Sequence, residues 1–533
     1  MTDRRIKILT FLLFAVFTVF LGRLFQLQII EGKKNRNLAE TNRLIKIPIP
    51  APRGIIYDRH GIVLADNEPK YLVKDKEIFR EEGIIRQSEG RDADLKIVLQ
   101  RKYRQSSMFA HSIGYLGEVT EKELSTGKLD LKGYGLGSWL GRVGIEAEYE
   151  EILKGRDGTE LAEVDTQGSI VRRTGRILPT SGKALNLALD SKLQEVAAKE
   201  LTGKKGAVIA QNPQNGEVFI LYSSPSFDPN LFITKDNNNS LAKLITDEEN
   251  RPLFNRVISG IFAPGSTFKI VTSTAGLEEK KITENTLIND PGVLTVGDFK
   301  YANWYFTQYG RTEGEINVVR ALIRSTDTFF YKLGEMVGPE KINFWAQKYN
   351  LDKIFGIDLP GEIPGFVGTP EWKKKYKNEG WFLGNTYHLA IGQGDIDLTP
   401  LAVNEMASVV ANNGKYCTPR MLRLGTENTP YQAECKDTGV KKEYLDIIKR
   451  GMIGACETGG TAYPFFDFKP VAACKTGTAE TGDGKTTHAW FTVFAPSENP
   501  TIVLTVLVER GGEGSTVAAP IAKEILKEYF KGK

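Results

Sequence analysis

The N-terminal end of the chain combines a short basic segment with a long apolar one. Three basic residues within residues 1–7 precede an unbroken run of apolar residues and threonines from Ile8 to Leu21, and further apolar positions extend it to Ile30. Roughly 20 apolar residues can cross a bilayer as a helix. A cleaved signal peptide is the competing interpretation, but no Ala-x-Ala cleavage site follows. We predict an uncleaved transmembrane anchor over residues 8–30, preceded by a cytoplasmic tail over residues 1–7.

Apolar patterns farther along the chain predict strands at both ends of a helical region. Apolar runs at 207–210 and 218–222 flank Asn215-Gly216, a sequence typical of tight hairpin turns. Helical patterns dominate from about 267 to 455. Strand patterns then return in three segments, at 471–480, 488–495 and 501–509. Two early strands, a helical region and three late strands predict an α+β fold with one sheet sandwiched by helices.

Local signals mark further elements. Asp190 is expected to cap a helix over residues 191–200. The last helix presents a core-facing stripe made of Ile521, Ile525 and Tyr529. Nearer the anchor, Asp58-Arg-His-Gly61 lies between apolar runs and predicts a hairpin turn. Residues from about 74 to 105 are rich in charge and show no clear period.

The balance of charge gives no support for nucleic acid as a partner. The 533 residues carry a formal net charge of +4, with acidic and basic positions interspersed. The four histidines are scattered and no C-x-x-C motif occurs, so we expect no zinc or other metal site and no cofactor.

All four cysteines lie in the C-terminal third of the chain. They allow three complete pairings, of which the local one joins Cys417 to Cys435 and Cys456 to Cys474. Disulfides are permitted outside the cytoplasm, and small buried thiols are the competing interpretation. A pair between Cys456 and Cys474 would fix the segment that carries Lys475.

The stretch Ser266-Thr-Phe-Lys269 carries the clearest chemical signal. A helix is expected to begin at the serine, after Pro264-Gly265, and a spacing of three places both side chains on one face. A lysine whose pKa is lowered by burial can take the serine proton and leave a nucleophilic alkoxide. The competing interpretation is an ordinary helix cap with a solvated lysine. A second S-x-x-K, Ser125 to Lys128, lies in a polar stretch without an apolar helix after it.

Ser325-Thr-Asp327 follows downstream and precedes an aromatic run. Ser325 is a candidate to relay the proton from Ser266 to a leaving amine. Asp327 is a candidate to hold Lys269 or Lys475 by a charge-assisted hydrogen bond. A helix N-cap would use the same residue types.

Lys475-Thr-Gly-Thr478 follows an apolar segment and is expected on a strand, although a turn would also use this sequence. Thr476 and Thr478 then share one face, and Gly477 lets a substrate backbone lie against the strand. The hydroxyls and Lys475 would bind a substrate carboxylate. The backbone N–H groups of Thr478 and Ser266 would form an oxyanion hole.

These three motifs occur in the order used by penicillin-binding proteins and serine β-lactamases. Further signatures extend the resemblance to nearly the whole chain, and it is most similar to the class B penicillin-binding proteins, in their elongation (cell-shape) branch. The signatures are Arg53-Gly-x-x-Tyr-Asp58-Arg59-x-Gly61, Gly141-Arg-x-Gly144-x-Glu146, Gly392-Gln-Gly394, Gly460-Thr-Ala462 and His488-Ala-Trp-Phe491.

The resemblance implies a β-lactamase/D,D-peptidase-like transpeptidase domain, an antiparallel sheet flanked by helices, over residues 191–533. It also implies a β-rich pedestal of the dimerisation type over residues 31–190. The chain departs from the family between Asn67 and His111, where the pedestal head is shortened. Partner contacts and activation are expected at that head.

The implied activity is peptidoglycan D,D-transpeptidation outside the cytoplasm. The penultimate D-alanine of a stem pentapeptide acylates Ser266, the terminal D-alanine leaves, and an amine on a neighbouring strand accepts the peptide. β-Lactams would mimic the donor and acylate the same serine. The implied partners are lipid-linked precursors, the membrane and a polytopic glycosyltransferase of the shape, elongation, division and sporulation (SEDS) family.

Other functions would use the same motifs. A D,D-carboxypeptidase or β-lactamase differs in that water attacks the acyl-enzyme, and the anchor and pedestal argue against a soluble lactamase. A division or sporulation role stays open beside elongation. An inactive scaffold that only regulates a glycosyltransferase is disfavoured because Ser266, Lys269, Ser325 and Lys475 are all present.

Overall fold

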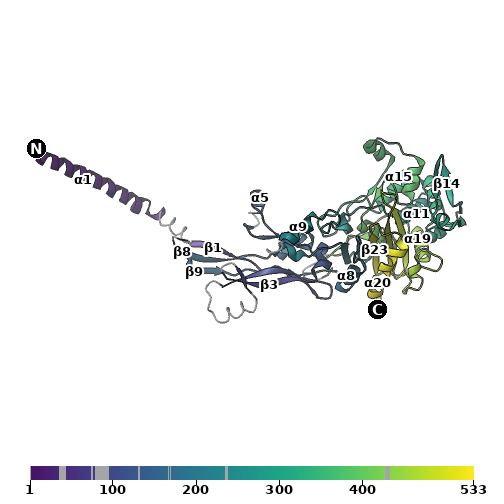
Figure 1. Cartoon of the computed structure of the whole chain (residues 1–533), viewed down its shortest axis with the longest axis horizontal. Helices are drawn as coiled ribbons and strands as arrows, with labels where there is room; N and C mark the ends of the chain where they lie inside the picture. Colours follow the sequence, from purple (N-terminus) through teal and green to yellow (C-terminus); the bar gives the residue numbers. More distant parts are fainter. Residues whose placement is uncertain are drawn as a thin grey trace. The chain divides into compact units, whose positions relative to one another are not determined.

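The structure is a computed structural model, drawn in Figure 1. The chain divides into two compact units. It describes residues 2–34, 44–73, 76–78, 95–129, 133–165, 167, 170–234, 238–425 and 432–532. The first unit comprises Met1–Gly54, Pro69–Leu99 and Lys154–Lys183, and the second comprises Ile55–Glu68, Gln100–Leu153 and Ala184–Lys533. Residues 74–75 and 79–94, which belong to the charged segment and the shortened head expected from the sequence, lie outside the described residues.

The first unit begins with the apolar helix that the sequence predicts. Helix α1 (Thr2–Phe25) continues into the π-helical turn η1 (Gln26–Ile30), and the stretch from Asp3 to Ile30 is long and apolar enough to cross a membrane. Its large apolar side chains are exposed, as those of Phe11 and Phe14 illustrate. This helix fits a single-pass membrane anchor.

Two sheets are built from strands that lie between residues 44 and 186. Strands β1 (Leu44–Ile49), β8 (Gly158–Val164) and β9 (Ile170–Ile177) form an antiparallel sheet in the order β1-β8-β9. A second sheet has the order β10-β2-β3-β4, and β5 also pairs with β3. Its strands are β2 (Ile56–Tyr57), β3 (Val63–Val73), β4 (Lys76–Ile78), β5 (Leu95–Tyr103) and β10 (Leu185–Asn186). The predicted turn at Asp58–Gly61 joins β2 to β3. Strands β4 and β5 lie in the charged segment, for which the sequence predicted no strand.

The second unit is built on the predicted five-stranded sheet. All its neighbouring strands are antiparallel, in the order β12-β11-β23-β22-β21. The strands are β11 (Gly206–Gln211), β12 (Val218–Ser224), β21 (Ala473–Glu480), β22 (Thr487–Ala495) and β23 (Ile502–Val508). The hairpin at Asn215-Gly216 and the three late strands are confirmed. The catalytic candidate Lys475 therefore lies on β21, at one edge of the sheet.

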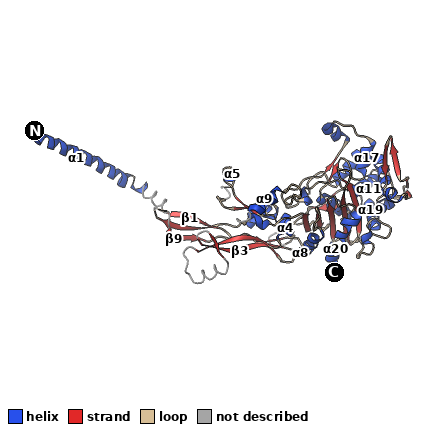
Figure 2. Cartoon of the chain, viewed as in Figure 1, coloured by secondary structure: helices blue, strands red, loops and turns tan. Residues whose placement is uncertain are grey.

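Helices cover both faces of this sheet, as Figure 2 shows. Helices α8 (Ser191–Glu200) and α20 (Ala519–Phe530) pack on one face, and α18 (Pro400–Ala411) packs on the other. Successive strand residues point to opposite faces, so Val208 joins one hydrophobic core while Ile209 joins the other. Asp190 caps α8 as predicted, through bonds from the N–H groups of Lys192 and Leu193.

The region between β12 and β21 is mostly helical, as expected, but it also contains short two-stranded sheets. Besides α18, its longer helices are α9 (Asn238–Thr246), α11 (Lys269–Glu278), α13 (Val318–Arg324), α14 (Asp327–Val337), α15 (Pro339–Lys348), α17 (Leu383–Ala390) and α19 (Lys442–Ala455). Its strands are β13 (Ile288–Asp290), β14 (Val293–Val296), β15 (Phe299–Ala302), β16 (Gly314–Ile316), β17 (Phe366–Val367), β18 (Ile396–Asp397), β19 (Lys415–Cys417) and β20 (Cys435–Asp437).

Two disulfides join the local cysteine pairs. Cys417 pairs with Cys435, and Cys456, at the end of α19, pairs with Cys474 on β21. Cys474 directly precedes Lys475, so this bond ties the strand of the third motif to α19. This is the local pairing among the three that the sequence left open, beside free buried thiols.

Both disulfides close loops of equal length, with a separation of 18 residues. We expect Cys417→Ser/Cys435→Ser and Cys456→Ser/Cys474→Ser each to lower the free energy of unfolding by about 3 kcal/mol, because each bond restricts the unfolded chain to the same extent. Denaturant unfolding of the full-length protein measures this loss. Mass spectrometry that finds four free thiols after isolation under oxidising conditions would refute the pairing.

Candidate active site

Ser266 lies in a tight turn that precedes the buried helix α11. The sequence predicted that the helix begins at the serine, but Gly265–Phe268 form a 3₁₀ turn, η4, and the α-helix begins at Lys269. Side chains three apart eclipse one another in a 3₁₀ turn, so Ser266 and Lys269 still lie on one side. The apolar side chains of Phe268, Val271 and Ala275 are fully buried and fix this helix in the core.

Gly265 lets this turn approach the edge strand. Its φ is +54°, and a Cβ atom there would lie 2.7 Å from the carbonyl oxygen of Thr478 on β21. Its N–H donates to the carbonyl of Gly392, in the Gly392-Gln-Gly394 signature, at 2.9 Å. The positive φ and the short distance to Thr478 both require a residue without a side chain. The glycine therefore allows the segment of Ser266 to lie against Thr478.

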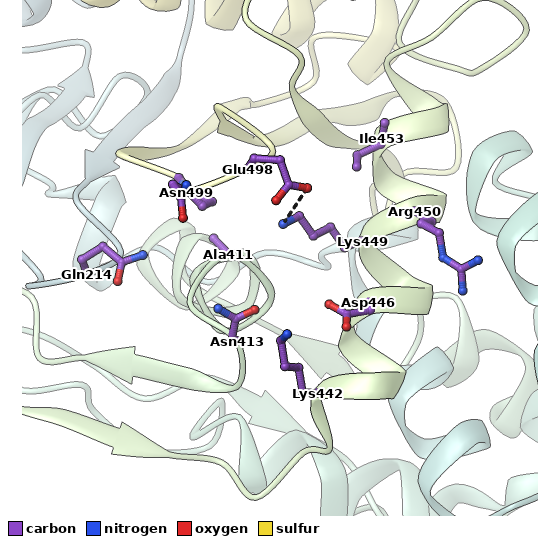
Figure 3. Close-up of a pocket in the computed structure, with 11 residues that line it drawn as sticks. Gln214, Ala411, Asn413, Lys442, Asp446, Lys449, Arg450, Ile453, Glu498 and Asn499 are labelled. Atoms are coloured by element: carbon purple, nitrogen blue, oxygen red, sulfur yellow. Dashed lines mark ion pairs between the residues drawn. The ribbon is translucent and has the colours of Figure 1, made fainter.

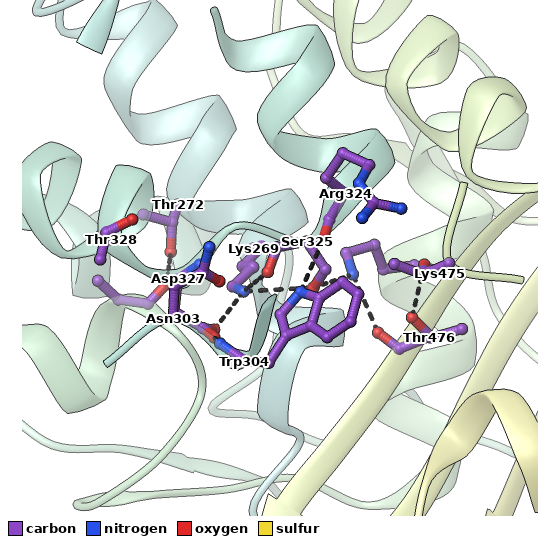
Figure 4. A network of polar contacts seen from close by, with 12 residues as sticks. Lys269, Thr272, Asn303, Trp304, Arg324, Ser325, Asp327, Thr328, Lys475 and Thr476 are labelled. Atoms are coloured by element: carbon purple, nitrogen blue, oxygen red, sulfur yellow. Dashed lines mark hydrogen bonds and ion pairs between the residues drawn. The ribbon is translucent and has the colours of Figure 1, made fainter. Parts of the chain in front are cut away.

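Lys269 points away from solvent toward the second motif (Figure 4). Its ammonium donates to Asp327 Oδ1 at 2.6 Å, to the Ser325 carbonyl at 2.8 Å and to Ser325 Oγ at 3.3 Å. The sequence left open whether Asp327 binds Lys269 or Lys475, and the structure pairs it with Lys269.

Lys475 approaches the same serine from the opposite side (Figure 4). Its Nζ donates to Ser325 Oγ at 2.8 Å and to the carbonyl of Thr476 at 3.0 Å. Lys475 lies on a strand rather than in a turn, as predicted. The hydroxyl of Ser325 therefore bridges two lysines that are 206 residues apart in the sequence.

Ser325 can serve both lysines because of its backbone conformation. It ends α13 in the left-handed region, with φ +54° and ψ 39°, and α14 begins two residues later. A non-glycine residue with positive φ is uncommon and is held in place by its surroundings. Here its carbonyl and its hydroxyl both point to lysine ammonium groups.

Burial changes the acid–base behaviour of both lysines. Removal from water lowers the pKa of Lys269, and the carboxylate of Asp327 opposes that shift. Burial also lowers the pKa of Lys475, to well below its ordinary value, and the charge of Lys269 adds to the effect. Lys475 contacts neutral acceptors only among the described residues, so it loses its proton more readily.

The substrate-binding candidates lie on β21 beside this network. Thr476 is buried, and its hydroxyl contacts that of Thr461, from the Gly460-Thr-Ala462 signature, at 2.9 Å. Thr478 is exposed. A Cβ atom at Gly477 would lie 2.9 Å from Thr267 Cγ2. Packing within the chain is therefore a sufficient reason for this glycine.

Sequence reasoning missed the residues that surround Asp327. The N–H of Trp304 donates to Asp327 Oδ2 at 3.3 Å, and its indole N–H donates to the carbonyl of Arg324 at 2.9 Å. The side-chain oxygen of Asn303 accepts from the N–H of Asp327 at 3.3 Å. Asn303 before an aromatic stretch signals a helix start, but nothing in the local sequence indicates its contact with Asp327.

Two further features bear on the chemistry. Within the described part of the chain, no group of three or more His, Cys, Asp or Glu side chains is arranged to hold a metal ion. Figure 3 shows a separate pocket, and none of the motif residues lines it. Its lining carries charges of both signs, such as those of Lys442 and Asp446.

Comparison with known proteins places this geometry in a family. Residues 206–527 match the penicillin binding protein transpeptidase domain, and residues 73–187 match the penicillin-binding protein dimerisation domain. The peptidoglycan D,D-transpeptidase MrdA of Acinetobacter baumannii is 31% identical over 585 residues, which cover 96% of this chain and 85% of that protein.

Solved structures give the same result. Penicillin-binding protein 2 (PBP2) of Helicobacter pylori, in complex with MreC, has a TM-score of 0.77 at 28% identity and covers 92% of this chain and 99% of its own. PBP2 of Pseudomonas aeruginosa, in complex with WCK 5153, has a TM-score of 0.74 at 31% identity and covers 91% and 96%. The α+β fold and the resemblance drawn from the motifs are thus confirmed, and the chain belongs to the class B penicillin-binding proteins, in the branch of penicillin-binding protein 2.

Proposed function

We propose that this chain is a peptidoglycan D,D-transpeptidase that cross-links stem peptides through an acyl-enzyme on Ser266, in cell elongation and shape maintenance. The observation that carries the proposal is the convergence of Lys269 and Lys475 on the hydroxyl of Ser325, next to the turn of Ser266. Such a chain of donors and acceptors can move a proton away from the serine and toward a leaving amine.

Acylation follows from the assigned roles. Neutral Lys269 takes the proton of Ser266, whose oxygen attacks the carbonyl carbon of the penultimate D-alanine. The N–H groups of Ser266 and Thr478 stabilise the oxyanion. The C–N bond to the terminal D-alanine then breaks, and the departing nitrogen receives a proton through Ser325, which Lys475 supports. Asp327 holds Lys269 in place.

Transfer runs the same route in reverse. An amine on a neighbouring strand attacks the ester carbonyl, loses a proton to the Ser325 relay, and releases Ser266 with its hydroxyl restored. Lys475, Thr476 and Thr478 bind the substrate carboxylate, with Gly477 between the two threonines on the same strand. Attack by water instead would make the enzyme a carboxypeptidase or a β-lactamase. The transpeptidase names of the relatives favour the amine.

The chain's organisation suits work at the outer face of the cytoplasmic membrane. We assign residues 1–7 to a cytoplasmic tail, 8–30 to the anchor, 31–190 to the pedestal and 191–533 to the transpeptidase domain. The substrate, a peptidoglycan stem peptide on a lipid-linked precursor or a glycan strand, lies outside the cytoplasm. The catalytic domain is therefore placed outside as well.

Labelling with a fluorescent penicillin tests the acyl-enzyme. We expect the full-length protein to form a stable fluorescent adduct, and Ser266→Ala to form none, because the bond is made to the serine oxygen. The unfolding midpoint of the variant checks that it folds. An adduct that decays within minutes would indicate a lactamase, and no adduct on folded wild type would indicate an inactive scaffold.

Spheroplasts treated with a penicillin that cannot cross the membrane test the orientation, and we expect the protein in them to be labelled. Labelling that appears only after lysis would contradict a catalytic domain outside the cytoplasm.

The pH dependence of acylation tests the pairing of Lys269 with Asp327. We expect the rate to rise with pH and to level off below about 10.4, the ordinary lysine pKa, because burial lowers the pKa of Lys269. Asp327→Asn removes the carboxylate that favours the charged lysine, so the rise should move to lower pH while the maximal rate falls. An unchanged rise, or one moved to higher pH, would contradict the pairing. Asp437→Asn, at an exposed carboxylate, is the control.

A polytopic SEDS-type glycosyltransferase is the proposed partner, because a cross-linking enzyme needs newly made glycan strands within reach of its anchor. The complex of the H. pylori relative with MreC supports the view that proteins of this branch work in assemblies. We expect the tagged full-length chain to co-purify with such a glycosyltransferase in mild detergent. Two variants distinguish the anchor from the pedestal as the site of contact. A complex that survives replacement of residues 1–30 by an unrelated anchor, but is lost when the pedestal is removed, would locate the contact in the pedestal. Failure of the intact chain to co-purify would contradict the partnership.

A further inference from the structure

The buried carboxylate of Asp290 lies outside the three motifs but is connected to them. Asp290 ends β13 and is 2% exposed. Its Oδ1 accepts from the N–H of Gly292 at 2.9 Å and from Thr328 Oγ1 at 2.6 Å. Its Oδ2 accepts from Asn303 Nδ2 at 3.0 Å and from the N–H of Glu313 at 2.9 Å. Four neutral donors thus fill the acceptor sites of one carboxylate.

Two of these donors lead directly to Asp327. Asn303 donates to Asp290 with its amide nitrogen and accepts from the N–H of Asp327 with its amide oxygen. Thr328 is the residue after Asp327 on α14, and its hydroxyl binds Asp290. Figure 4 shows Asn303 and Thr328 close to Asp327. The start of α14 is therefore attached to Asp290 through a side chain and through the neighbouring backbone.

The other two donors fix the segments that adjoin the site. The N–H of Gly292 orders the turn after β13, and the carbonyl of Gly292 accepts from the N–H of Asn303 at 2.8 Å. Glu313, whose N–H binds Asp290, holds Arg324 at 2.6 Å through its own carboxylate. Arg324 directly precedes Ser325. The neighbours of the serine and of the acid in the second motif, Arg324 and Thr328, are therefore both connected to one buried carboxylate, Arg324 through Glu313 and Thr328 directly.

We propose that Asp290 is a positioning residue for the transpeptidase reaction, which sets the place of Asp327, and through it of Lys269, without contacting substrate. The proposal rests on the proposed function, because it assigns Asp290 to the acylation chemistry of Ser266. A catalytic group displaced by about 1 Å can lose on the order of a hundredfold in rate, so such a support matters for activity as well as for folding.

The test compares two buried carboxylates of the same kind. Asp358 is 4% exposed and likewise binds neutral donors, the N–H groups of Met421 and Leu422 and the hydroxyl of Tyr149, but none of its partners belongs to the three motifs. Asp290→Asn and Asp358→Asn both replace an acceptor oxygen by an NH₂ group that faces donors, so both should destabilise the fold. Only the first should disturb Asp327.

Acylation by fluorescent penicillin is measured against pH for full-length wild type, Asp290→Asn and Asp358→Asn. We expect Asp290→Asn to lower the acylation rate constant by on the order of tenfold or more, and to move the rise with pH to lower values, as loss of the Asp327 contact would. The charged groups that face Lys269 are Asp327 from α14 and Lys475 from β21. Asp358→Asn should keep the wild-type rate and profile once folded.

Equal effects of the two variants, or a wild-type rate and profile for folded Asp290→Asn, would overturn the proposal. Thr328→Val decides the question if Asp290→Asn does not fold, because it removes one hydroxyl contact and nearly conserves shape. A lower rate with the same direction of pH shift supports the role of Asp290, and a wild-type profile refutes it. Absence of labelling in wild type itself would instead refute the proposed function.

Discussion

Lys269 and Lys475 are both fully buried, and among the described residues only Asp327 brings a carboxylate into contact with either of them. A buried charge is unfavourable unless it is paired and hydrogen-bonded. The domain therefore buries two lysines with one counter-charge, and burial lowers the pKa of both side chains. The carbonyl and hydroxyl of Ser325 supply the remaining acceptors. The left-handed backbone at Ser325, the start of α14 and the edge strand β21 all serve this single arrangement.

The approach of these elements depends on positions without side chains. Gly265 fits against the carbonyl of Thr478, and a Cβ atom at Gly514 would lie 2.4 Å from the carbonyl of Gly477. The indole of Trp490 on β22 donates to the carbonyl of Ala263 at 2.9 Å and holds the segment before Ser266. Strand β21 is thereby enclosed by backbone on two sides, and the disulfide from Cys474 attaches it to α19. Contacts between backbones leave little freedom to relax, so the site is placed more rigidly than flexible side chains alone would allow.

The sequence predicts the parts of this site that depend on local order. Spacing places Lys269 beside Ser266, the apolar segment before Lys475 indicates a strand, and the order of the motifs indicates the chemistry. The start of the helix was wrong by three residues because a 3₁₀ turn, which spacing does not distinguish from an α-helix, precedes it. The partner of Asp327 stayed open because either lysine satisfies the same charge rule. Strand β5 was missed because its apolar period is hidden among charges.

Contacts that join distant segments account for what the sequence does not indicate. Asp290, Asp358 and Glu362 are separate in the sequence and resemble ordinary polar residues, yet each accepts from backbone N–H groups in the folded domain. A carboxylate offers several acceptor sites, so one side chain can satisfy the N–H groups of an irregular loop that has no strand or helix to do so. Loops held in this way can follow the shape that a site requires. Their conformation then depends on single residues, and these supports can be identified only once the chain is folded.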